Sequence, residues 1–184
     1  MVQHSSLTGS ECHEPKGADT ATADHVYVAD GATSGSFQLL NPYGGFRYND
    51  TGGSGTTYTT PTSYTLVGMA TTTTNLSNFT HNSLGRLTYT GTEDRHIHGV
   101  VDISFKFNTG SGSEAFFAIY KNGSILGTPN VEGQATAGNS NYEHMAMHFD
   151  DMASTNDYYE VYVKAVSNNV IIDTHYMFLM GMPG

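Results

Sequence analysis

The stretch HGVVDISFKF, residues 98–107, alternates strictly between two sets of side chains. The first set is apolar or small and comprises Gly99, Val101, Ile103, Phe105 and Phe107. The second set comprises His98, Val100, Asp102, Ser104 and Lys106. Successive side chains of a β-strand point to opposite faces, so this period of two predicts a long strand that buries its apolar face in a core.

Further strands are predicted downstream of this stretch. Tyr142–Phe149 and Tyr158–Val166 show the same alternation. Asn122-Gly123 lies between two apolar runs, which is the strongest short-range signal of a β-hairpin. Val170–Met180 is apolar almost throughout, so we expect it to be covered on both faces and to lie at a subunit interface.

Long strands joined by turn-rich loops, with no convincing helical period, indicate an all-β protein. We predict an antiparallel jelly-roll sandwich with an extended N-terminal arm. Periodicity alone does not separate a jelly roll from an immunoglobulin-like sandwich. The outward positions of the predicted strands carry tyrosine and histidine, and the simplest cover for such a face is another copy of the chain.

The first part of the chain differs from the rest in composition and in the length of its predicted strands. Residues 1–24 are small and polar, which is typical of an arm that is ordered only when docked. Short strands are predicted near 25–28, 37–40 and 63–70, with a glycine-rich loop before the last of them. We therefore expect two parts: an anchoring region with short strands over 1–82 and a jelly-roll trimerisation domain over 83–184.

Charge and composition exclude several classes of function. The formal net charge is −10, and the seven Lys and Arg are scattered, so nothing predicts binding to nucleic acid or to an anionic membrane. We find neither a signal peptide nor an apolar run of membrane-spanning length. The single cysteine, Cys12, excludes a disulfide framework and favours synthesis in a reducing compartment.

Three motifs carry a resemblance to a known family: LTYTG at 87–91, YKNG at 120–123 and NDYYEVYV at 156–163. The segment that contains them resembles the trimeric jelly-roll heads of the C1q and tumour-necrosis-factor type, in particular those of bacteriophage structural proteins. Residues 4–37 are similar to a leader of phage virion proteins. The resemblance implies a homotrimer with its terminal strands near the three-fold axis, and it implies no catalytic residues.

His96 and His98 are the candidate metal ligands. Side chains two apart on a strand share one face, so three copies around a three-fold axis would present six nitrogens to one transition metal. The alternative is that both are outward polar residues that pack against tyrosine or contact solvent. We assign no metal and expect no cofactor.

Two other polar groups are weaker candidates. His144 and His148 would be adjacent on a helix, but on the predicted strand they lie about 13 Å apart, at a rise of about 3.3 Å per residue. Asp150, Asp151, Asn156 and Asp157 could hold Ca²⁺, but they lack the spacing of a calcium-binding helix-loop-helix. A turn in which Asn and Asp bond to the local backbone is the favoured interpretation.

Catalytic motifs are missing from the sequence. There is no GxSxG, and Cys12 and His13 are neighbours on a predicted arm without a third group, so we expect no enzymatic activity. The aromatic residues of the glycine-rich loop could form a binding surface or could anchor the arm on a neighbouring subunit, and anchoring is favoured. These residues are Tyr43, Phe46, Tyr48 and Tyr58.

The expected function follows from these features. A compact trimer with a short arm suits a phage head decoration, or cement, protein that binds the major capsid protein through its N-terminal region and stabilises the shell. Such a protein would be made in the cytoplasm of the host bacterium and would lie on the capsid surface of the virion. The alternative is a tail-fibre or head-fibre tip that binds a receptor or glycan on the host, and an enzyme such as a depolymerase is the least favoured class.

Overall fold

The computed structural model describes residues 25–29, 35–39, 41–50, 55–58, 62–109, 113–127, 132–137 and 141–182. All regular elements in these ranges are strands. Contacts divide the chain into two compact units, Met1–Leu40 and Asn41–Gly184. No helix in the described ranges is long and apolar enough to cross a membrane.

The first unit contains one antiparallel hairpin, β1 (His25–Ala29) paired with β2 (Gly35–Leu39). Both strands were predicted from the sequence to within a few residues. Residues 1–24, the predicted arm, lie outside the described residues.

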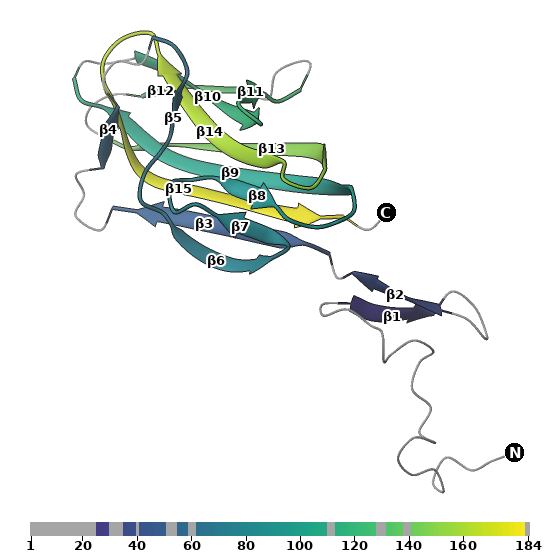
Figure 1. The fold of residues 1–184 in the computed structure, drawn as a ribbon. Helices are drawn as coiled ribbons and strands as arrows, with labels where there is room; N and C mark the ends of the chain where they lie inside the picture. Colours follow the sequence, from purple (N-terminus) through teal and green to yellow (C-terminus); the bar gives the residue numbers. More distant parts are fainter. Residues whose placement is uncertain are drawn as a thin grey trace, which may run out of the picture. The chain divides into compact units, whose positions relative to one another are not determined.

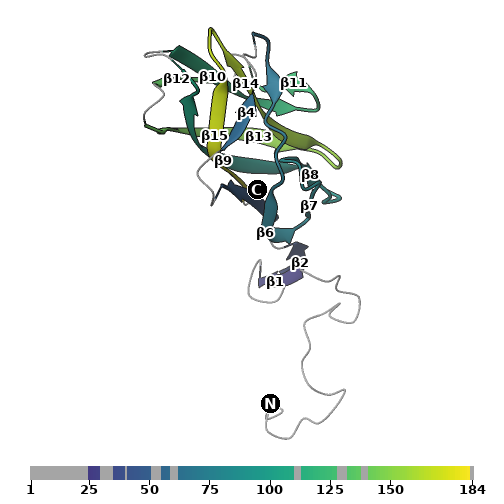
Figure 2. The ribbon, with the colours of Figure 1, turned by 90° about the vertical axis from the view of Figure 1, so that its left-hand side faces the viewer.

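The second unit is a sandwich of two antiparallel sheets (Figures 1 and 2). One sheet has the order β13-β9-β15-β3-β6, with β4 beside β15. Its strands are β3 (Tyr43–Asn49), β4 (Thr56–Tyr58), β6 (Thr72–Ser77), β9 (Arg95–Phe107), β13 (Glu143–Ala153) and β15 (Val170–Gly181). The terminal strand β15 therefore lies at the centre of this sheet, hydrogen-bonded to β9 on one side and to β3 on the other.

The other sheet has the order β11-β10-β14-β8-β7, with β12 beside β10 and β5 beside β14. Its strands are β5 (Thr65–Leu66), β7 (Phe79–His81), β8 (Leu87–Tyr89), β10 (Ser113–Lys121), β11 (Ser124–Ile125), β12 (Glu132–Ala137) and β14 (Tyr158–Ala165). From β12 onward, consecutive strands alternate between the two sheets. This crossing of the sandwich confirms the predicted jelly roll.

The core lies between the inner faces of the two sheets. All five residues of the apolar set in 98–107 are buried, as the alternation predicts. Phe105 of β9 meets Phe117 of β10 with ring centroids 5.0 Å apart. Burial of each such side chain contributes about 1.5–3 kcal/mol. Ser104 is the exception to the alternation, since it belongs to the outward set but is only 2% exposed.

The expected boundary between residues 82 and 83 is wrong. Strand β3 pairs with β15 from Tyr43↔Met180 to Asn49↔Thr174, so the glycine-rich segment belongs to the sandwich. Gly44 and Gly45 serve packing rather than flexibility: a Cβ on Gly44 would lie 2.7 Å from the Cβ of Phe79, and one on Gly45 would lie 2.8 Å from Thr74 Oγ1. Two neighbouring elements approach the backbone there, and only glycine admits them.

Two details of the strand predictions also change. The segment predicted as a strand over 63–70 contains only the short β5, while the threonine-rich stretch after it forms β6. Strand β15 is not covered on both faces within one chain: one face is buried, and the other is half-buried or exposed. The uncovered face is the starting point for the functional site.

Candidate functional site

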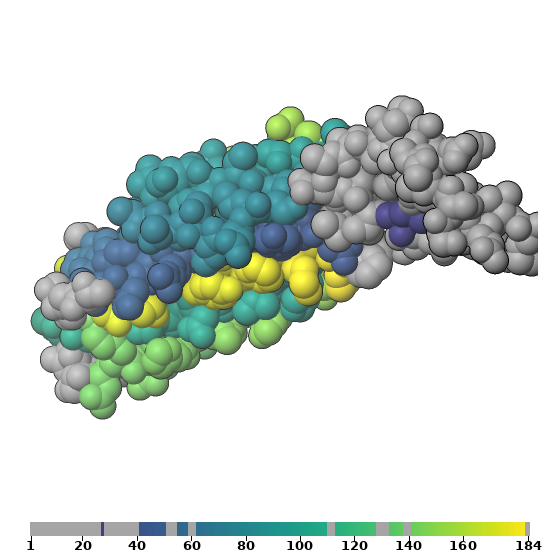
Figure 3. All heavy atoms as spheres, turned by 90° about the horizontal axis from the view of Figure 1, so that it is seen from below, coloured from purple at the N-terminus to yellow at the C-terminus, as the bar shows by residue number. Residues whose placement is uncertain are grey.

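The outward side of the β13-β9-β15-β3-β6 sheet, here called the six-strand face, carries the candidate site. The lower part of Figure 3 shows strands of this sheet, with β15 in yellow between β3 in blue and β9 in teal, and β13 in green beyond β9. Its outward residues are Tyr43, Arg47, His96, His98, Val100, Asp102, His144, Ala146, His148, Asp150, Met152, Tyr176, Phe178 and Met180. Four histidines and two carboxylates are thus interleaved with apolar side chains.

An apolar band crosses this face. Phe178 of β15 is opposite Val100 of β9, and Met180 is opposite Tyr43 of β3. Met180 is 44% exposed and Tyr43 38%, while Met152 on β13 is 42% exposed. Large apolar side chains left open on several adjacent strands mark an interaction surface more often than a solvated one.

An irregularity in the pairing of β15 with β9 decides which side chains of β15 face the core. The pairing with β9 shifts between Ile172 and Thr174, so Asp173 is an extra residue. The inserted residue changes whether even- or odd-numbered residues face the core: Ile172 and Met177 are both buried, although one position is even and the other is odd. The bulge therefore allows Tyr176 and Phe178 to point outward from a strand that is apolar on both sides.

His98 lies in a polar cluster next to the apolar band. Its Nδ1 is 2.8 Å from Asp150 Oδ1, and its Nε2 is 3.5 Å from His148 Nδ1. The two imidazole rings are 5.6 Å apart between centroids. The pairing of β9 with β13 creates this cluster, because Asp150 is directly opposite His98 and His148 is one outward position away.

The two predicted metal candidates lie on the same face, as the strand geometry requires, but His96 is not a member of this cluster. Its side chain is exposed opposite Met152. Within the described residues of one chain, no group of three or more His, Cys, Asp or Glu side chains could hold a metal. A site shared by three copies on an axis stays a prediction.

His144 and His148 both lie on β13, a strand, so their four-residue spacing brings them to one face without contact. The Nδ1 atom of His144 is 4.0 Å from Asp102 Oδ1 across the strand pair. Sequence reasoning dismissed His148 as structural and missed its pairing with His98, since only the register of β13 against β9 reveals that pairing.

The acidic segment 150–157, which runs from the end of β13 into the turn before β14, is held by contacts within the protein. Asp157 accepts hydrogen bonds from the backbone N–H of Ser154 and from Asn122 Nδ2, and Lys121 Nζ is 2.9 Å away. Burial alone would raise the pKa of Asp157, but these bonds outweigh it and hold the pKa below its usual value. Asp151 pairs with Lys121 and accepts a bond from Tyr159. These contacts fit the structural turn that the sequence favours over a Ca²⁺ loop.

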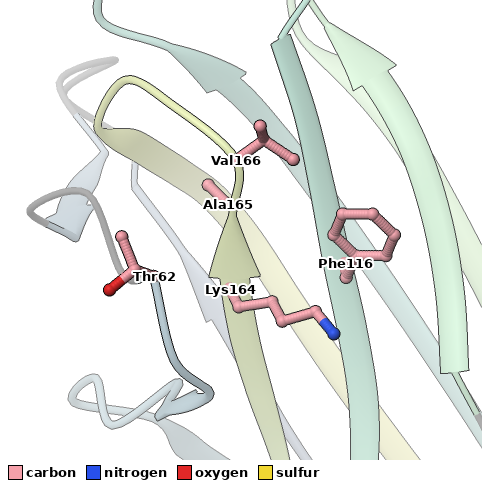
Figure 4. Close-up of a pocket in the computed structure, with 5 residues that line it drawn as sticks. All are labelled: Thr62, Phe116, Lys164, Ala165 and Val166. Atoms are coloured by element: carbon pink, nitrogen blue, oxygen red, sulfur yellow. The ribbon is translucent and has the colours of Figure 1, made fainter.

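The outward side of the other sheet, here called the seven-strand face, is rich in aromatic residues and cations. Tyr120 and Tyr162 stack with centroids 3.8 Å apart. The Lys164 ammonium lies 4.3 Å from the ring centre of Tyr64 and 4.8 Å from that of Phe116. Figure 4 shows an open pocket beside this lysine, lined by Thr62, Phe116, Lys164, Ala165 and Val166.

A partly buried ion pair lies on the same face. Glu160 is 1% exposed and accepts a hydrogen bond from Arg86 Nε at 2.8 Å. The Arg86 guanidinium also lies 4.0 Å from the ring centre of Tyr158. Burial, followed by the nearby Glu160 carboxylate, raises the pKa of Tyr162. Arg86, Glu160 and Lys164 on this face therefore each have a partner within the chain.

The aromatic residues of the glycine-rich segment do not form one surface. Phe46 is fully buried and stacks on His81 at 5.2 Å, with His175 edge-on at 4.9 Å. Tyr48 and Tyr58 pack against the core, and only Tyr43 is exposed. The interpretation of all four as arm anchors or as a loop binding surface is wrong, because β3 carries Phe46 into the sandwich.

His175 is a buried histidine that sequence reasoning did not single out. It is 0% exposed, and neither ring nitrogen has a hydrogen-bond partner among the described residues. Burial lowers the pKa of this imidazole to about 3. The residue is therefore neutral in the folded protein, and it occupies a core position rather than a reactive one.

Comparisons with known proteins place the fold. No family model matches the chain, and no curated protein matches it. PRD1 vertex protein P5 superposes with a TM-score of 0.52 at 9% identity, over 78% of this chain and 97% of that one. Eiger TNF from S. frugiperda superposes with a TM-score of 0.51 at 7% identity, over 77% of this chain and 94% of that one. These likenesses show the fold, which is a jelly-roll sandwich.

Proposed function

We propose that this protein is a non-enzymatic phage structural protein that forms a homotrimer through the six-strand face and decorates the assembled capsid. The observation that carries the proposal is the uncovered apolar band on β15 and its neighbours, with Tyr43 and Met180 both more than a third exposed. A chain that keeps such a face in water loses the hydrophobic free energy that burial would supply, about 25 cal/mol per Å² of apolar surface.

Three copies close into a ring when each buries one patch of its surface against a different patch of the next. The sequence resemblance implies terminal strands near a three-fold axis, and the terminal strand β15 is the centre of the six-strand face. A stable contact needs about 800 Å² from each partner. The outward residues of four adjacent strands supply a surface suited to that role.

The N-terminal unit, Met1–Leu40, is the proposed anchor to the major capsid protein. It is separate from the sandwich by its contacts, so it is available for a role other than trimerisation. Three linked anchors would raise the avidity for a lattice by effective concentration. Binding to the assembled shell alone would stabilise that shell by mass action. A fold shared with a vertex protein supports a place on a virion surface.

The test has two parts. Analytical ultracentrifugation of the full chain should give a trimer, and deletion of residues 1–24 should leave the trimer intact but abolish binding to capsids that lack the protein. Omission of the protein from the virion should lower the temperature at which particles release their genome. A monomer in the first experiment, or full capsid binding by the deletion variant in the second, would contradict the corresponding part.

A second candidate function is a fibre tip that binds a receptor or glycan on the host surface. The observation that favours it is the stack of Tyr120 and Tyr162 beside Lys164, since flat rings and a cation next to an open pocket suit a sugar or an anionic group. Copy number discriminates the two functions. Hundreds of copies per particle with no hit on a glycan array favour decoration, and a few to a few dozen copies with specific glycan binding favour the fibre.

A further inference from the structure

We infer that His98 and His148 form a binding site for a divalent transition-metal ion, Zn²⁺ in the first instance, within a single chain. The facing nitrogens, His98 Nε2 and His148 Nδ1, are 3.5 Å apart. Two imidazole nitrogens bound to one tetrahedral zinc at about 2.0–2.1 Å lie about 3.4 Å from each other. The pair therefore has the separation that a shared metal requires.

Asp150 prepares His98 for this role. The carboxylate accepts a hydrogen bond from His98 Nδ1–H at 2.8 Å, which keeps the proton on Nδ1 and leaves a lone pair on Nε2. A carboxylate that holds the far nitrogen of a metal-binding imidazole is the usual support for such ligands, and it fixes both the tautomer and the orientation of the ring. In this chain the support is present on the strand directly opposite His98.

Metal binding requires little rearrangement of His148. Its Nδ1 faces His98 Nε2, so one proton lies between the two nitrogens when the site is empty. A neutral His148 can shift that proton to its own Nε2 and present the Nδ1 lone pair to the ion. The exchange is a change of tautomer, with no net release of a proton.

The site is half complete in one chain. No third His, Cys, Asp or Glu joins it within the described residues, so this part of the chain supplies two ligands and no more. Imidazole ligands suit Zn²⁺, Cu²⁺ and Ni²⁺ and do not suit Ca²⁺ or Mg²⁺. This assignment differs from a site of His96 and His98 on a three-fold axis, which would bind one ion per three chains, because both of its ligands come from the same chain.

Isothermal titration of the full chain with ZnCl₂ at neutral pH tests the inference. His98→Gln and His148→Gln should each remove one equivalent of bound Zn²⁺ per chain, and Asp150→Asn should weaken that equivalent about tenfold. His144→Gln is the matched control, because it removes an exposed histidine from the same strand and face and should change nothing.

Each variant should keep the fold of the parent, because none of the four side chains belongs to the core, and circular dichroism checks this. Equal Zn²⁺ uptake by the parent and by His148→Gln would overturn the inference. Loss of the same equivalent in His144→Gln would also overturn it, as would a stoichiometry of one ion per three chains that survives His148→Gln.

Discussion

The two outward faces of the sandwich differ in how far one chain satisfies them. On the seven-strand face, the buried Glu160 is paired with Arg86, and Lys164 lies against two aromatic rings. On the six-strand face, methionine and aromatic side chains stay open beside titratable groups that contact each other. The seven-strand face therefore pairs these groups within the chain, whereas the six-strand face leaves apolar side chains exposed. The six-strand face is the better candidate for assembly.

The largest effect is expected when a charge is placed in the apolar band of the six-strand face. Phe178→Asp should raise the dissociation constant of the trimer about 100-fold or more, because a carboxylate would have to be buried without a partner in the contact. Val166→Asp, at a 64% exposed position directly after β14 of the other sheet, is the control and should leave the assembly unchanged. Sedimentation at several concentrations measures both, and equal dissociation of the two variants would show that the faces do not differ.

An acid titration distinguishes the buried face of the six-strand sheet, where His175 lies, from its exposed face. The pKa of His175 is about 3 in the folded protein and 6.5 in the unfolded chain, so the unfolded state binds the proton first as pH falls. Stability is then lost progressively below about pH 6.5, by about 3 kcal/mol at about pH 4. His175→Leu should remove that loss in urea unfolding measured across this range. His144→Gln, which changes an exposed histidine of the six-strand face, should retain it.

A third experiment tests whether the ion pair on the seven-strand face stabilises the fold. Arg86→Ala should destabilise the fold by about 2 kcal/mol, because it leaves the Glu160 carboxylate buried without its cation. The value is set below that of a fully buried pair because the Arg86 side chain is 38% exposed. Arg47→Ala, on the six-strand face, should cost under about 0.5 kcal/mol. Chemical denaturation gives both values, and a reversed order would contradict the distinction between the faces.

The smallest effect on stability is expected at the pocket beside Lys164. Lys164→Ala should change the free energy of unfolding by under about 1 kcal/mol, since contacts between a cation and an aromatic ring at an exposed site contribute little. If the fibre-tip function is correct, the same variant should lose glycan binding on an array. Unchanged binding would remove the seven-strand face from consideration as a receptor site.

The sequence was sufficient for the class of fold and for the identity of the inner face. Val101, Ile103 and Phe105 were predicted to be buried from alternation alone, and they are. It failed at Phe46, because five glycines in a short segment are typical of a loop, whereas two of them admit Phe79 and Thr74 against a strand. The local composition of a segment does not reveal that side chains distant in the sequence pack closely against its backbone.

The candidate site, like the fold, was predicted in part from the sequence and was decided in part by the tertiary structure. Strand periodicity determined by itself that His96, His98, His144 and His148 point outward, because the side-chain period of a strand is a local property. The register of β9 against β13 decided that His98 meets His148 and Asp150. The central position of β15, and with it the exposed apolar band, likewise came only from the pairing of strands far apart in the chain. Pairing between strands depends on the closure of the whole sandwich, so no single stretch of sequence specifies it.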